Sequence, residues 1–71
     1  MDKPTAQVLA ASLEMAIAKL SETLVVAERS LTAEEYASIK RHLGLNIGRL
    51  SNDVLDPIYA QFPDIAPRGV L

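Results

Sequence analysis

The stretch Leu31-Thr32-Ala33-Glu34-Glu35-Tyr36 decides the fold of this chain, because it predicts that one helix follows directly on another. Thr32 and Glu35 have the spacing of a capping box, in which each side chain accepts a hydrogen bond from the backbone N–H of the other residue. Leu31 and Tyr36 are spaced to make the apolar contact that closes over the start of such a helix. The box therefore predicts a helix that begins at about residue 33.

The residues before the box predict a first helix over about 5–29. Apolar residues recur there at spacings of three and four, which places them on one side of a helix. These residues are Leu9, Leu13, Ile17, Leu20, Leu24, Ala27 and Leu31. A polar line with a spacing of seven runs beside them and consists of Gln7, Glu14, Ser21 and Glu28. Asp2 and Pro4 predict the start of the helix, because Asp caps helix N-termini and Pro is tolerated in the first turn.

The residues after the box predict a second helix over about 33–55. An apolar stripe with spacings of three and four continues through it without a change of phase. The stripe consists of Tyr36, Ile39, Leu43, Ile47, Leu50 and Val54. Because a break at Gly44 or Gly48 would reset this phase, the unbroken stripe favours one continuous helix.

The second helix is predicted to weaken at Asp56-Pro57, because the residue before a proline is disfavoured in the helical conformation. Asp56 is then expected to cap a short helix or turn over 57–62, with Pro57 at its first position. Pro57, Pro63 and Pro67 fall within eleven residues and predict a stiff, extended tail over 63–71. Its apolar residues favour a tail that folds back over one end of the helices, and a docking peptide is the alternative.

These elements predict an all-α fold, with residues 1–71 forming a single helical domain. The connection between the helices is only about three residues long, so the helices are expected to be antiparallel neighbours in a hairpin. A single core in a chain of this size contributes at most about 3–5 kcal/mol. No cysteine is present to add a disulfide, yet 49% of the 71 residues are apolar and the mean hydropathy is +0.16. This excess predicts a homodimer in which two hairpins form a four-helix-type bundle.

Residues outside the predicted seam between the helices indicate where a second copy, or another protein, would bind. The candidate interface residues are Val8, Met15 and Val26 of the first helix and Ala37, Gly44 and Gly48 of the second. Each glycine costs a helix about 1 kcal/mol relative to alanine, so a compensating role is expected. Close approach of another helix is the favoured role, and a kink or a bound ligand is the alternative. The matching small residues of the first helix are Ala10, Ala16 and Ala18.

The alternative interpretation of the second helix is a small DNA-binding regulator with a helix-turn-helix around 39–54. In that motif Gly44 would occupy the turn and Asn46 would cap the recognition helix. Lys40 and Asp53 stand where a small and an apolar residue are expected, which counts against the motif. A net charge of −2 and an isoelectric point near 5.2 provide no attraction to nucleic acid. Nucleic acid is therefore the less favoured partner.

No residue pattern in the chain predicts an enzyme. Glu34, Ser38 and His42 share a helix face at spacings of four, but an exposed helix offers neither the pocket nor the oxyanion hole that such a triad requires. A single His and no Cys exclude the common zinc sites. No catalytic, cofactor-binding or metal-binding residue is predicted, and Lys40-Arg41-His42 is interpreted as a solvated surface cluster.

The N-terminal residues predict no targeting segment, since Met1-Asp2-Lys3-Pro4 lacks the positively charged start of a signal peptide. The apolar stretch that follows is interrupted by Glu14 and Lys19, whereas a membrane span needs about 20 apolar residues. The absence of cysteine is compatible with a reducing compartment. We therefore expect a cytoplasmic protein without a membrane segment.

The segments Leu55-Asp56-Pro57-Ile58-Tyr59 and Phe62-Pro63-Asp64-Ile65-Ala66-Pro67 resemble the C-terminal ending of a group of small, uncharacterised bacterial helical proteins. The shared pattern is Pro-Ile-Tyr, then Pro-Asp/Glu-Leu, then Pro, and it covers less than a third of the chain. Ile65 stands where the pattern has Leu. The resemblance implies a bacterial cytoplasmic origin, and it implies no activity, cofactor or site residue.

Overall fold

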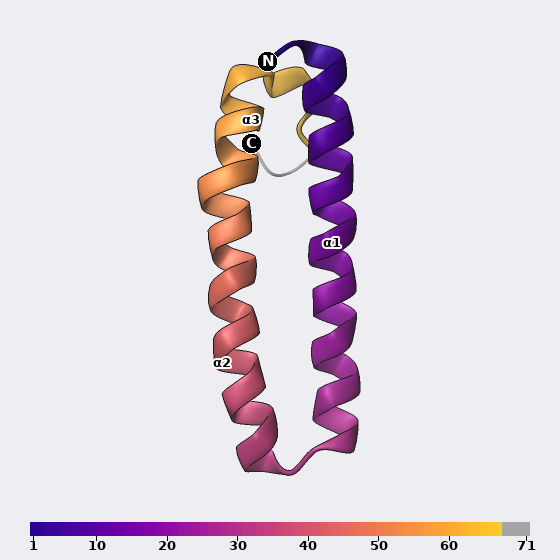
Figure 1. Cartoon of the computed structure of the whole chain (residues 1–71), viewed down its shortest axis with the longest axis vertical. Coiled ribbons are helices and arrows are strands. Elements are labelled where there is room, and N and C mark those ends of the chain that lie inside the picture. The colour runs from indigo at the N-terminus through magenta and orange to yellow at the C-terminus, as the bar shows by residue number, and fades with distance from the viewer. Residues whose placement is uncertain (68–71) are drawn as a thin grey trace.

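A computed structural model describes residues 1–67 of the chain as a helical hairpin (Figure 1). Its elements are α1 (Lys3–Ser30), α2 (Ala33–Arg49), the π-helical segment η1 (Leu50–Leu55), α3 (Asp56–Gln61) and the 3-10 turn η2 (Pro63–Ile65). α1 and α2 lie side by side and antiparallel, and α3 lies beside the N-terminal end of α1 (Figure 1). The predicted all-helical hairpin is confirmed for the described residues, which contain no strand. Positions 68–71 of the predicted tail lie outside them.

The hairpin is elongated, with extents of 45 × 21 × 16 Å and a radius of gyration of 14.4 Å. A compact domain of this length has a radius of gyration of about 11 Å. Although α1 is 28 residues long, no helix within residues 1–67 is long and apolar enough to cross a membrane. The two long helices form a single layer, so no further helix of residues 1–67 covers the seam between them along most of its length (Figure 1).

The helix starts follow the capping signals in the sequence. The Asp2 carboxylate accepts a hydrogen bond from the Thr5 backbone N–H at 2.9 Å, and hydrogen bonding from Thr5 lowers the pKa of Asp2. At α2, the Glu35 N–H donates to Thr32 Oγ1 at 3.2 Å, and the Thr32 N–H donates to Glu35 Oε1 at 3.0 Å. The bond from the Thr32 backbone lowers the pKa of the Glu35 carboxyl. The predicted N-cap and the predicted capping box are both confirmed.

α2 runs without a break through both of its glycines, from Ala33 to Arg49. A helix-turn-helix in this region would need a turn at Gly44, and the continuous helix contradicts that geometry. The predicted close approach of α1 at the glycines is also wrong, because a Cβ added at Gly44 or Gly48 would meet no neighbouring atom within 4 Å. Gly44 and Gly48 each directly follow a residue of the α2 stripe, Leu43 and Ile47, so they lie beside the seam and not within it.

The predicted short C-terminal helix is present as α3 (Asp56–Gln61), but Asp56 does not cap it, and the chain stays helical through Asp56-Pro57. Asp56 is helical (φ −58°, ψ −43°), and its N–H donates to the Ser51 carbonyl, five residues earlier. In a regular α-helix the ring of Pro57 would clash with the carbonyl four residues earlier, and Pro57 has no N–H to donate. The wider turn of η1 accommodates the proline, so the helix continues into α3.

The π-helical segment also shifts the apolar stripe by one residue. A π turn holds one residue more than an α turn, so the position buried against α1 moves from Val54 to Leu55. Leu55 is 2% exposed, whereas Val54 is 40% exposed. The predicted stripe therefore holds as far as η1 and is wrong at Val54.

The best-buried residues gather where α3 packs against α1. They are Ala6, Ala10, Leu55, Ile58 and Tyr59. Phe62, Ile65 and Ala66 pack against this cluster, so the described part of the tail folds back over this end of the hairpin, as predicted. It begins with the 3-10 turn η2 and is not extended there, as it was expected to be. Toward the loop that joins α1 to α2, Ala27 is the one other buried apolar residue of the described chain.

Candidate functional site

The seam between the two arms of the hairpin can be reached from two sides, and these sides differ in chemistry. One side is a groove whose lining is apolar apart from Ser12 and Gln61. The other residues of this groove are Met1, Leu9, Leu13, Val54, Pro57 and Ile58. We call this groove, with its continuation along both arms, the apolar face. The opposite side carries Lys3, Glu14, Tyr59 and Asp64, and we call it the tyrosine face.

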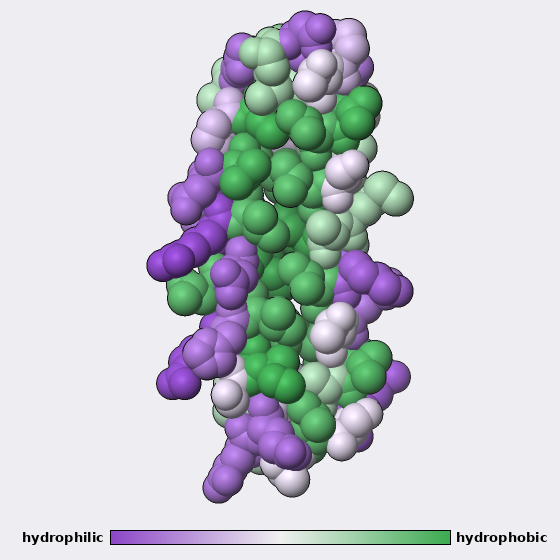
Figure 2. Space-filling view, viewed as in Figure 1, coloured by the Kyte–Doolittle hydropathy of each residue, from purple (hydrophilic) through white to green (hydrophobic). Residues whose placement is uncertain are grey.

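The apolar face extends along the hairpin because of helical spacing. In α1 it continues from Leu13 through Ala16 and Leu20, which follow at spacings of three and four. In the second arm it continues from Val54 toward the loop through Leu50, Leu43 and Ile39. Figure 2 shows a hydrophobic band along the whole length of the hairpin, between more hydrophilic edges. Large apolar side chains meet water along this band, since Leu9, Ile39 and Val54 are 41%, 36% and 40% exposed.

The tyrosine face carries two tyrosines that interact with glutamates of α1. The Tyr59 hydroxyl donates to Glu14 Oε1 at 3.0 Å, and burial, followed by this bond to Glu14, raises the pKa of Tyr59. Near the loop, partial burial and then the charge of Glu28 raise the pKa of Tyr36. Glu14 and Glu28 are fourteen residues apart, so they lie on the same side of α1. The polar line seen in the sequence therefore belongs to the tyrosine face.

The tail crosses the tyrosine face and leaves the apolar face open. Asp64, Ile65 and Pro67 line the depression on the tyrosine face, where Lys3 forms an ion pair with Asp64. The hydrogen bond and charge of the Lys3 ammonium lower the pKa of Asp64. None of the described tail residues, 62–67, lines the apolar groove.

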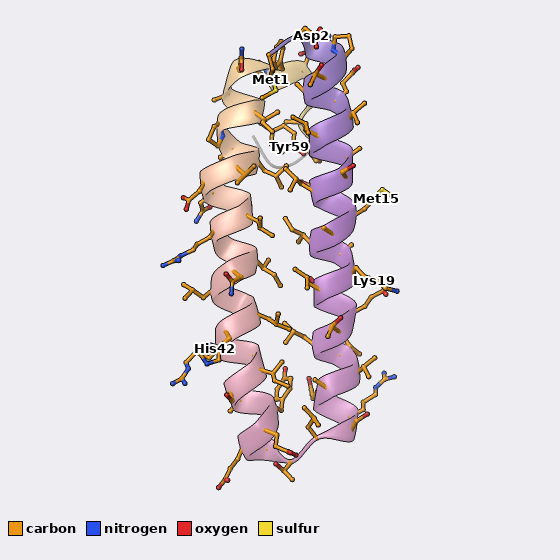
Figure 3. The ribbon with its side chains drawn as sticks, viewed as in Figure 1. Met1, Asp2, Met15, Lys19, His42 and Tyr59 are labelled. Atoms are coloured by element: carbon orange, nitrogen blue, oxygen red, sulfur yellow. The ribbon has the colours of Figure 1, made fainter. Side chains whose placement is uncertain are left out.

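The predicted interface residues of α1 lie on the outer side of the hairpin, away from α2. Val8, Met15 and Val26 are 66%, 72% and 62% exposed. The side chain of Met15 points away from α2 (Figure 3). Val8 and Val26 share this outer side, because they are seven and eleven residues from Met15.

The predicted interface residues of α2 lie on a different side. Ala37, Gly44 and Gly48 each directly follow a residue of the α2 stripe, namely Tyr36, Leu43 and Ile47. In α3, Ile58 lines the apolar groove and the next residue, Tyr59, lines the tyrosine face. Because both helices turn in the same sense, the residues that follow the stripe in α2 also lie toward the tyrosine face. The structure therefore does not bring the two predicted groups together on one surface.

The described residues do not assemble a chemical site. Residues 1–67 contain no group of three or more side chains that could hold a metal ion. A shallow depression near the loop is lined by Glu34, Ser38 and Arg41 but not by His42. The His42 side chain points away from α1 (Figure 3). The side chains of Glu34, Ser38 and His42, which are spaced by four residues, therefore do not converge on one cavity.

The polar line in α1 is a signal that could have revealed the apolar face. Glu14 and Glu28 lie on one flank of the apolar stripe of α1. The other flank, at Leu9 and Leu20, carries no charged residue. The hydrogen bond between Tyr59 and Glu14 joins residues 45 positions apart, and no local pattern indicates it. Comparison of the chain with family models, with curated proteins and with solved structures finds no match.

Proposed function

We propose that this chain is a non-catalytic interaction protein that acts as a homodimer, with two hairpins packed into a four-helix-type bundle. The observation that carries the proposal is the apolar face, along which large aliphatic side chains are exposed in the single hairpin (Figure 2). Contiguous exposed apolar surface of this kind is typical of protein–protein interfaces.

The small core of the single hairpin supports the same proposal. Six apolar residues of the described chain are buried, and five of them belong to the cluster at the α3 end. Helices in proteins derive most of their stability from tertiary packing of an apolar side. Pairing of two hairpins would bury the seam along its whole length and would supply this packing.

The role we propose for the dimer is regulatory binding of another protein, without chemistry of its own. Support comes from the outer side of α1, where exposed aliphatic residues remain available after pairing through the seam. The cysteine-free composition supports a reducing compartment, and we place the dimer in the cytoplasm.

Sedimentation equilibrium of the full chain tests the homodimer. We expect a mass twice that of the 7.7 kDa chain at micromolar concentration, and a melting temperature that rises with protein concentration. The mass of a single chain, together with a cooperative melt that does not depend on concentration, would overturn the proposal.

A further inference from the structure

We infer, on the basis of the proposed homodimer, that the second copy docks on the apolar face and that the tyrosine face is turned outward. The size of the exposed surface, the distribution of charge around the hairpin and the symmetry of a dimer each point to this side.

The exposed area of the hairpin exceeds that of a compact protein by about the amount that one dimer partner buries. The chain exposes 5177 Å², whereas a compact monomer of 7.7 kDa exposes about 4,300 Å². The difference of about 850 Å² is close to the roughly 800 Å² that each partner buries in a stable interface of standard size. The single hairpin therefore exposes enough extra surface for an interface of standard size.

The apolar face is the side of the hairpin whose burial removes the least charge from water. Its groove contains two polar residues, Ser12 and Gln61, and both are uncharged. The other lining residues are aliphatic, methionine or proline. Burial of such a surface gains about 25 cal/mol per Å² of apolar area, and no lining residue of the groove has a charged side chain that would lose its water.

The other two sides carry charges that would have to be buried. On the tyrosine face, Glu14 and Asp64 flank the Tyr59 hydroxyl and the folded tail. On the outer side of α1, Lys19 and Glu22 form an ion pair at 3.2 Å between Met15 and Val26. Removal of ions from water costs several kcal/mol per ion unless each finds a close partner. These sides are therefore poorer surfaces for a stable dimer.

A second copy of this chain matches the apolar face in both length and chemistry. A partner must present an uncharged apolar band along a hairpin 45 Å long, and a two-fold axis places such a band opposite itself. The band in Figure 2 runs along the two antiparallel arms drawn in Figure 1, so two copies stacked face to face form two layers with four long helices, as in a four-helix bundle.

Neighbouring residues of α1 provide a matched test of the docking side. Leu9 belongs to the apolar face and Val8 to the outer side, and both are exposed in the single hairpin, at 41% and 66%. Leu9→Arg should weaken the dimer by roughly a hundredfold or more, because it buries an unpaired charge in the interface. Val8→Arg should leave the dimer dissociation constant within about threefold of the wild type. Sedimentation equilibrium measures both, and circular dichroism checks that both variants are helical.

The second arm provides the same contrast at Ile39 and Leu45, which are 36% and 56% exposed. Ile39→Arg should dissociate the dimer, and Leu45→Arg should not. If the wild type is dimeric but Leu9→Arg and Ile39→Arg remain dimeric, the docking side is wrong and the homodimer stands. If the wild type is monomeric, the proposed function itself fails.

The glycines of α2 distinguish the apolar face from the side predicted from sequence. A Cβ at Gly44 or Gly48 meets no neighbour within 4 Å of the single hairpin, so Gly44→Ala and Gly48→Ala should raise the melting temperature and preserve the dimer. If the interface were instead on the side of α2 that carries Gly44 and Gly48, the added methyl groups would lie in the interface and would weaken the dimer. Dissociation by these alanines would therefore overturn the inference.

A thiol-labelling measurement covers the case in which an arginine variant fails to fold. The chain has no cysteine, so Val54→Cys and Leu45→Cys each introduce a single thiol at a site that is 40% or 56% exposed in the hairpin. Maleimide should label the Val54→Cys variant at least about tenfold more slowly at micromolar than at nanomolar concentration, because dimerisation covers the site. The Leu45→Cys variant should react at the same rate at both concentrations. Protection of Leu45→Cys without protection of Val54→Cys would overturn the docking side.

Discussion

The two ends of the hairpin are held together in different ways. At the α3 end, Leu55, Ile58 and Tyr59 are between 2% and 5% exposed and are packed against α1 and the tail. At the loop end, the capping box at Thr32 closes the turn, while Leu31 and Tyr36 remain half-exposed. One end is therefore held by tertiary packing, and the other by local hydrogen bonds.

The difference shows what a third element contributes to a two-helix fold. The π-helical segment carries the helix past Pro57 and brings α3 and the tail onto α1. No such element covers the loop end in the described chain, so its apolar side chains depend on a partner for burial. We expect substitutions at the α3 end to have the larger effects on the stability of the single chain.

The largest loss of stability is expected for Leu55→Ala. Removal of a fully buried leucine side chain leaves a cavity and costs about 2–5 kcal/mol, which approaches the whole contribution of a core in a chain this small. Leu45→Ala is the matched control, because Leu45 is 56% exposed and alanine favours the helix. Urea unfolding at a fixed protein concentration, followed by circular dichroism, measures both. Equal losses at the two positions would mean that the α3 end is not a core.

A smaller loss is expected for Tyr59→Phe, which removes the hydrogen bond to the Glu14 carboxylate. Hydrogen bonds to charged groups contribute about 1.5–3 kcal/mol, and we expect the lower end because Glu14 is exposed and regains water. Tyr36→Phe at the loop end should cost less, since Tyr36 is only half-buried. A larger loss at Tyr36 than at Tyr59 would reverse the ranking of the two ends.

Tyr59→Phe should also change the response of the protein to alkaline pH. The pKa of Tyr59 is raised in the folded chain, so the folded state holds the phenol proton more tightly than the unfolded state. The associated stability is complete below the ordinary pKa of about 10 and is lost as the pH rises through the folded value. The melting temperature of the wild type should therefore fall more steeply above about pH 10 than that of Tyr59→Phe. Parallel curves would show that Tyr59 is not protected.

The helix starts and the hairpin could be predicted from the sequence because their causes are local. Asp2 hydrogen-bonds three residues ahead, and the Thr32–Glu35 box spans four residues. The π turn could not be predicted in this way, because Pro57 alone favours a break. Packing of Leu55 and Ile58 against α1 stabilises the continuous helix, and that packing is a tertiary effect.

The candidate docking side could be predicted only in part from the sequence, for a similar reason. Helical spacing showed that apolar residues such as Val8 and Met15 lie outside the seam, and both are exposed in the structure. Spacing within one helix does not show which side of the seam another segment covers. The position of the tail and the link between Tyr59 and Glu14 make that distinction, and both join residues far apart in the chain.

The capping box is the strongest local contribution at the loop end, and Thr32→Ala should cost about 1 kcal/mol. The substitution leaves the Glu35 N–H without its acceptor and removes half of the reciprocal pair. Thr23→Ala is the control, because Thr23 is an exposed residue within α1, where alanine is the better helix former. Thermal unfolding should therefore show a lower melting temperature for the first variant and an equal or higher one for the second. If Thr32→Ala lowered the stability as much as Leu55→Ala, the α3 end would not be the more strongly held end of the hairpin.

The smallest effect is expected for Asp64→Asn, which removes the ion pair that joins the tail to Lys3. Both side chains are largely exposed, at 47% and 61%, and exposed pairs contribute little. The pKa of Asp64 is lowered, so its contribution is present above its ordinary pKa of 3.8 and is lost as the pH falls through the lower folded value. Melting curves of the variant and the wild type should nearly coincide at neutral pH, and any difference should vanish in acid. A large loss at neutral pH would show that charge, and not the packing of Phe62 and Ile65, holds the tail in place.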